Sequence, residues 1–119
     1  MFLKMTDEAQ AKLQYRGDGE ILLDMNDGVG EYSKVGICSL DTSFRFLIID
    51  KDQSKKDYDT VIDSTIGEIP VKEYSKRYLD EEMTLELDKR LQVLKLNSSS
   101  GLLDGHVEIM DLRPEIMRS

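Results

Sequence analysis

The side chains best suited to chemistry are the single cysteine, Cys38, and the single histidine, His106. Thiolates are soft, strong donors for zinc and for iron–sulfur clusters, and imidazole binds the same kinds of metal. Cys38 ends a stretch, residues 27–39, in which three glycines favour turns over a continuous strand. We therefore expect an irregular loop with a partly reachable sulfur, which is a ligand, a reactive group or the remnant of such a site.

Three other interpretations concern the same part of the sequence or the same two residues. Isolated cysteines most often behave as small, inert apolar residues, which is the simplest alternative for Cys38. A Cys38–His106 pair is the minimum for a thiol nucleophile, but no local signature of a protease or transferase accompanies it. The segment 28–33 hints at a phosphate loop, yet it lacks the third glycine and the Lys-Ser/Thr pair. We expect no catalytic residues.

The elements that must position these residues are mostly short strands. Thr6 is a good N-cap, and the acidic residues after it suit the start of a helix over 7–15, with Ala9 and Leu13 on its inner face. A second, short helix is expected near 74–79, and 98–101 is expected to be a flexible link. Apolar alternation and turn residues predict strands at 2–5, 20–26, 43–50, 60–63, 68–72, 84–88, 91–97 and 106–112.

This pattern predicts a mainly β (α+β) fold, a β-sandwich of short mixed strands with one N-terminal helix. Residues 1–112 are expected to form a single domain, followed by a C-terminal tail over 113–119. Strand 43–50 is the most apolar, with Phe44, Phe46 and Ile48 on one face.

Composition narrows the classes of function. The chain has 119 residues and a net charge of −8, and its basic residues are scattered among acidic ones. Phosphate backbones and anionic membranes both require clustered cations, so we expect no nucleic acid and no membrane as partner. There is no apolar run of spanning length and no signal-like start. A single cysteine forms no internal disulfide, so a cytoplasmic protein is expected.

The order of the motifs resembles the A-type iron–sulfur carrier family, also called HesB-like. The helix start 6–11 and the glycine- and serine-rich loop 28–39 with its cysteine match two successive parts of the family pattern. The Ser-led helix 74–80, the Asp-terminated strand 84–88 and the Asn-terminated strand 94–97 match the later parts. The resemblance covers roughly residues 2–112 and implies the HesB-like fold and a link to iron–sulfur cluster biogenesis.

The chain departs from the family at its end. Functional carriers have a Cys-Gly-Cys pair shortly after the Asn, whereas residues 101–107 contain no cysteine. By resemblance, Cys38 would be the retained ligand, His106 would stand at the tail position, and Asp104 could supply an oxygen. Clusters usually need four ligands, so we expect no stable cluster on a monomer. A homodimer would offer two thiolates.

The expected function is that of a non-enzymatic HesB-like protein linked to iron–sulfur cluster biogenesis. Iron or an iron–sulfur cluster is its candidate cofactor, although the fold carries over from the family more directly than cluster binding does, because only one cysteine is kept. Its expected partner is an iron–sulfur assembly or recipient protein. A metal-free protein-interaction or regulatory module on the same fold is the main alternative. A thiol redox sensor that uses Cys38 is the third.

Overall fold

The computed structural model describes residues 1–14, 19–25, 43–50 and 52–113. The helices are α1 (Asp7–Gln14) and the 3₁₀ helix η2 (Glu73–Tyr78). The strands are β1 (Phe2–Met5), β2 (Glu20–Met25), β3 (Phe44–Ile49), β4 (Thr60–Ser64), β5 (Ile69–Val71), β6 (Glu82–Asp88), β7 (Val93–Ser98) and β8 (Gly101–Asp111).

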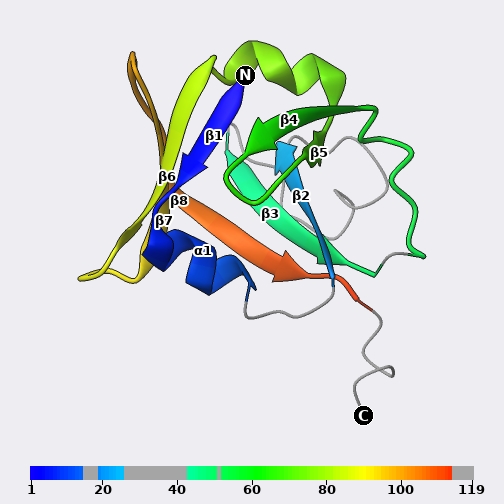
Figure 1. Ribbon diagram of the computed structural model, residues 1–119, viewed down its shortest axis with the longest axis horizontal. Helices are drawn as coiled ribbons and strands as arrows, with labels where there is room; N and C mark the ends of the chain where they lie inside the picture. Colours follow the sequence, from blue (N-terminus) through cyan, green and yellow to red (C-terminus); the bar gives the residue numbers. More distant parts are fainter. Residues whose placement is uncertain (15–18, 26–42, 51, 114–119) are drawn as a thin grey trace.

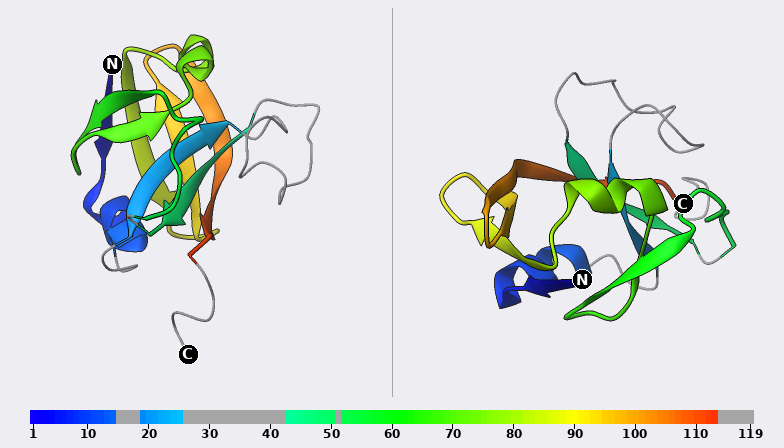
Figure 2. Two further views of the ribbon diagram at one scale, coloured as in Figure 1. Left: turned by 90° about the vertical axis from the view of Figure 1, so that its right-hand side faces the viewer. Right: turned by 90° about the horizontal axis from the view of Figure 1, so that it is seen from above.

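In the described residues, eight strands form one sheet in the order β2-β3-β8-β7-β6-β1-β4-β5. Its two end strands, β2 and β5, lie against each other, so the sheet curves until it is nearly closed (Figures 1 and 2). β1 runs parallel to β4 and β6, and β3 runs parallel to β8. The mainly β prediction is confirmed. The two-layer sandwich is not confirmed, because these strands belong to one continuous sheet.

The N-terminal helix forms for the reasons expected from the sequence. The backbone N–H of Ala9 donates to Thr6 Oγ1 at 3.3 Å, which is the predicted N-cap. Asp7 and Glu8 occupy the first turn, where the helix dipole favours negative charge. Ala9 and Leu13 are fully buried, as predicted. Figure 1 shows α1 and η2 at opposite ends of the curved sheet.

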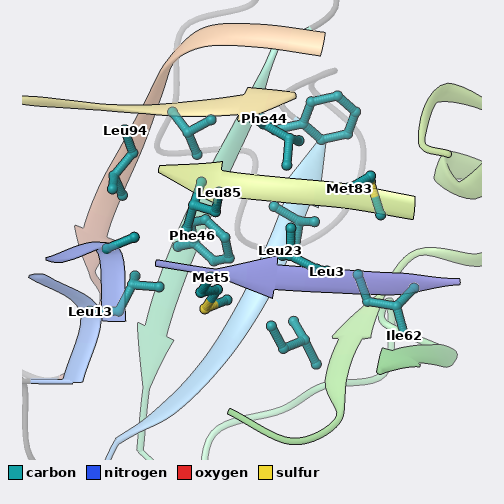
Figure 3. Close-up of a cluster of buried hydrophobic side chains, with 14 of the residues drawn as sticks. Leu3, Met5, Leu13, Leu23, Phe44, Phe46, Ile62, Met83, Leu85 and Leu94 are labelled. Atoms are coloured by element: carbon teal, nitrogen blue, oxygen red, sulfur yellow. The ribbon is translucent and has the colours of Figure 1, made fainter. Parts of the chain in front are cut away.

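Two apolar clusters hold the sheet together. The larger lies inside the curve and includes Leu3, Phe46 and Leu85, all fully buried (Figure 3). The smaller consists of Leu22, Leu47, Ile49 and Tyr58. Since successive strand residues point to opposite faces, β3 contributes Phe46 to one cluster and Leu47 and Ile49 to the other, and all of its residues are buried. Burying each such side chain contributes about 1.5–3 kcal/mol.

Two sequence expectations need correction in the C-terminal half. Residues 98–101 are not a flexible link, because Ser98 and Gly101 are register partners that close the turn from β7 into β8. Gly101 has a φ of +138°, which favours glycine, and β8 begins there, five residues before the expected start at His106. Leu91, placed in a strand, is exposed and lies before β7.

Within the part of the chain that the structure covers, no helix has the length and apolar character needed to cross a membrane.

Candidate functional site

Cys38 lies outside the described residues, in the segment 26–42 that connects β2 to β3. We call residues 26–42 the Cys38 segment. The expectation that its sulfur is reachable therefore stays a prediction. The strands at its two ends are described, and Met25 and Phe44 form the last register pair of the β2–β3 ladder. The geometry of these two ends is the structural information nearest to the thiol.

A buried lysine contacts the end of β2, just before the Cys38 segment. Lys72 directly follows β5, and its side chain is 1% exposed. Its Nζ donates to the carbonyl oxygen of Met25 at 3.3 Å and lies 3.0 Å from Asp24 Oδ1. The same amine is about 6 Å from the ring centres of Tyr58 and Tyr74, within range of cation–π attraction. Lys72 thus bridges β5 and β2, the two end strands of the sheet.

Asp24 is the centre of this buried polar network. Its Oδ2 accepts a hydrogen bond from Arg45 Nε at 2.8 Å, and its Oδ1 accepts one from the Tyr58 hydroxyl at 2.9 Å. Arg45 is the register partner of Asp24 and also contacts the Met110 sulfur at 3.0 Å through Nη1. One fully buried carboxylate therefore faces two cations, Arg45 and Lys72, and a phenol.

The network changes the titration of its tyrosine. Burial raises the pKa of the Tyr58 hydroxyl well above its usual range, and the neighbouring Asp24 carboxylate raises it further. Tyr58 is therefore a neutral hydrogen-bond donor throughout the physiological range. Buried ion pairs are costly to desolvate and add little net stability.

A carboxylate contacts the start of β3, after the Cys38 segment. Asp104 Oδ2 accepts the backbone N–H of Phe44 at 2.7 Å, and Asp104 Oδ1 accepts the backbone N–H of His106 at 2.9 Å. Asp104 stands where the β7–β8 register shifts, next to its partner Leu96. Both oxygens of the proposed oxygen ligand thus accept backbone donors, and the side chain stabilises the start of β3.

His106 is exposed on β8. It lines a surface hollow of about 260 Å³ together with Lys12, Gln92 and Glu108. Arg45 and Glu108 are register partners in the parallel β3–β8 pair. Among the described residues, no group of three or more His, Cys, Asp or Glu side chains could hold a metal ion.

Sequence reasoning missed the buried network. Apolar alternation over 20–26 favours an outward position for Asp24, which lies between Leu23 and Met25 in the sequence. The available signal was a pair of opposite charges inside two neighbouring apolar strands, Asp24 after Leu23 and Arg45 between Phe44 and Phe46. Such charges are rarely buried unless they are paired. Lys72 carries no comparable local signal, since only the closing of the sheet brings it to β2.

Comparison with known proteins gives consistent results. The family described as "Iron-sulphur cluster biosynthesis" matches residues 1–111. A crystal structure of a protein from Lactobacillus salivarius that is assigned to Fe-S biosynthesis is 42% identical, with a TM-score of 0.87, over 96% of this chain and 100% of that one. A second such structure, from Lactobacillus acidophilus, is 27% identical, with a TM-score of 0.69, over 93% of this chain and 90% of that one. A search of curated proteins found no match.

Proposed function

The chain belongs to the iron–sulphur cluster biosynthesis family, the HesB-like proteins, and from this premise we propose that it is a non-enzymatic carrier of iron or of an iron–sulfur cluster. The cargo would be held by Cys38 thiolates from two chains, with His106 as an additional donor. The partners would be an assembly protein that supplies the cargo and a recipient that accepts it. The proposed setting is the cytoplasm.

The observation that carries this proposal is the position of the only thiol in the chain. Cys38 stands in the sequence between β2 and β3, and the facing ends of these two strands are held by Lys72, which donates to the Met25 carbonyl oxygen, and by Asp104, which accepts from the Phe44 N–H. The family match over residues 1–111 links this chain to iron–sulfur cluster biosynthesis. Thiolates are the usual ligands of such clusters, so Cys38 is the donor on which the proposal depends.

The number of donors limits how a cluster could be bound. An iron–sulfur cluster usually takes four thiolate-type ligands, and one chain supplies a single cysteine. The described residues add no three-ligand group that could replace the missing thiolates. One chain therefore fits a cluster only in part. Two chains supply two thiolates and two imidazoles, and an external thiol could complete the set. Cargo held in this way would exchange readily, as transfer to a recipient requires.

Anaerobic reconstitution with iron and sulfide tests the proposal. The wild type should gain visible absorbance and retain iron through a desalting column when a small thiol is present. Cys38→Ala should lose both, and His106→Ala should retain less iron. Glu108→Gln is the matched control for His106, since it changes an exposed residue two positions away on the same strand, and it should behave as wild type.

Each failure of this experiment has a distinct meaning. If Cys38→Ala retains as much iron as the wild type, Cys38 is not a ligand and the carrier proposal is wrong. If no variant retains iron, a metal-free interaction module is the better description of the protein. If there is no iron but the Cys38 thiolate forms well below the ordinary thiol pKa, a redox sensor is favoured.

A further inference from the structure

The β4–β5 hairpin closes the sheet against β2 without a backbone ladder. Among the described residues, β2 and β5 contact each other, but they are not hydrogen-bonded neighbours in the sheet. On the other side of the hairpin, β4 pairs with β1 at two positions, Phe2 with Asp63 and Leu3 with Ser64. The β2–β3 and β6–β7 ladders have six pairs each. In the described part of the chain, a short parallel ladder is therefore all that joins the hairpin to the rest of the sheet through register pairs.

The segment that contains the hairpin, residues 58–76, is hydrogen-bonded within itself, and we call it the hairpin segment. At its base, the backbone N–H of Glu73 donates to Asp59 Oδ1 at 2.8 Å. At its turn, the Ser64 hydroxyl donates to the carbonyl oxygen of Gly67 at 2.6 Å. The β4–β5 register pairs lie between these two contacts. All of these bonds can persist when the segment moves as one body.

One carboxylate on β2 binds the hairpin at the outer ends of both of its strands. Tyr58 lies shortly before β4, and Lys72 directly follows β5. The Tyr58 hydroxyl donates to Asp24 Oδ1 at 2.9 Å, and Lys72 Nζ lies 3.0 Å from the same oxygen. At the turn, the contact is with the backbone of β1, where the N–H of Thr65 donates to the carbonyl oxygen of Leu3 at 3.1 Å. Buried polar side chains thus hold one end of the hairpin, and backbone hydrogen bonds hold the other.

We propose that the hairpin segment opens from β2 as one unit: its turn stays on β1, and the contacts of Asp24 with Tyr58 and Lys72 keep it closed. The opening uncovers the edge of β2, an end strand of the sheet. This motion is a property of the protein without cargo, and it does not depend on whether the protein binds iron.

Two effects act on this opening in opposite directions. A buried ion pair adds little net stability, because desolvation of both charges offsets their attraction, and Asp24 and Lys72 recover water when the segment opens. The burial of Ile62, Ile69 and Val71 in the larger apolar cluster opposes the opening. The open form is therefore a minor state of the folded protein, of the kind that hydrogen exchange detects.

Native-state hydrogen exchange, followed by NMR at low concentrations of urea, tests the proposal on the wild type. The slowly exchanging amides of β4 and β5 should share one opening that is about tenfold or more as frequent as the opening of β6 and β7. Its urea dependence should be smaller than that of global unfolding, because it exposes less surface. If all slow amides share one opening with the urea dependence of global unfolding, no separate unit exists and the proposal is overturned.

Lys72→Met removes the ammonium group and keeps an apolar stem. It should make the opening about tenfold more frequent, since Asp24 is left with one cation instead of two. The matched control is Lys55→Met. Lys55 also pairs with a carboxylate on β2, Glu20 at 2.9 Å, but these side chains are 38% and 31% exposed, so exchange should stay near the wild-type rates. Wild-type exchange of β4 and β5 in Lys72→Met would overturn the role of the Asp24 contacts in closing the segment.

Leu94→Ala distinguishes the local opening from global unfolding. Leu94 is 1% exposed on β7 and lies across the core from Ile62 (Figure 3). A cavity there should speed exchange in β6 and β7 by about tenfold or more and leave β4 and β5 unchanged, because β7 stays folded when the hairpin segment opens. Equal acceleration in both regions would overturn the proposal. Should this variant not fold, the urea dependence measured on the wild type decides.

Discussion

Asp24→Asn is the substitution that should most clearly reveal how much the buried polar network between β2 and β5 contributes to stability. The change keeps the shape of the side chain and removes its charge. Asp24 is fully buried, and its oxygens lie 2.8 Å from Arg45 Nε, 3.0 Å from Lys72 Nζ and 2.9 Å from the Tyr58 hydroxyl. The variant takes away the carboxylate that both cations face.

Removing one partner of a buried ion pair costs about 3–5 kcal/mol, because the opposite charge stays in a poorly solvated site. For a domain of this length, that loss lowers Tm by about 12–20 °C. Lys72→Met should cost less, about 1–2 kcal/mol, since Asp24 still binds Arg45 and Tyr58. The double variant should cost less than the sum of the two, by about 1–3 kcal/mol, because the two residues interact directly.

Urea unfolding followed by circular dichroism measures the free energy of unfolding of the wild type, of Asp24→Asn, of Lys72→Met and of the double variant. The control is Glu20→Gln, on the same strand, where the side chain is 31% exposed and pairs with Lys55 at 2.9 Å. Exposed pairs contribute about 0–1 kcal/mol, so this variant should be nearly as stable as the wild type. A loss in Asp24→Asn no larger than that of Glu20→Gln would refute the reasoning about the buried network.

Three further predictions concern stability. Gly67→Ala should cost about 1 kcal/mol in thermal unfolding because Gly67 has a φ of +108°. Gly105→Ala should cost less, since the added Cβ would meet only the flexible Leu102 side chain, at 3.4 Å. Equal losses of stability in the two glycine variants would contradict this. Phe46→Ala should cost about 3–5 kcal/mol in urea unfolding by opening a cavity, whereas the exposed Leu102→Ala should cost little. Above about pH 10, the ordinary tyrosine pKa, wild-type stability should fall with pH, because the unfolded chain ionises while the raised pKa keeps Tyr58 neutral. Tyr58→Phe should show a shallower fall, and an equal slope would show that Tyr58 is not responsible.

Much of the fold follows from local sequence signals. The capped helix at Asp7–Gln14 and the apolar strand at Phe44–Ile49 are confirmed because capping and alternation act over a few residues. The predicted start of β8 was wrong, because Gly101 and the serines before it are residue types that are typical of a flexible link. In the structure the same residues form a tight turn, so long-range pairing with β7 decided the outcome.

The candidate site could be predicted only in part. Composition alone singles out Cys38 and His106, because they are the only cysteine and the only histidine in the sequence. The roles of Lys72 and Asp104 could not be predicted, because each acts on a backbone group 47 or 60 residues away in sequence. Such contacts depend on how the sheet closes, and no local pattern encodes that. The interpretation of Asp104 as an oxygen ligand stays a prediction, and in the structure its two carboxylate oxygens accept the backbone N–H groups of Phe44 and His106.

The carrier proposal is tested most directly by measuring iron and sulfide across a size-exclusion column after anaerobic reconstitution. One chain supplies one thiolate, so iron should elute with a dimer, at about one cluster per two chains, and be lost in Cys38→Ala. Near-stoichiometric iron and sulfide on a monomer, or equal iron in Cys38→Ala, would contradict the account.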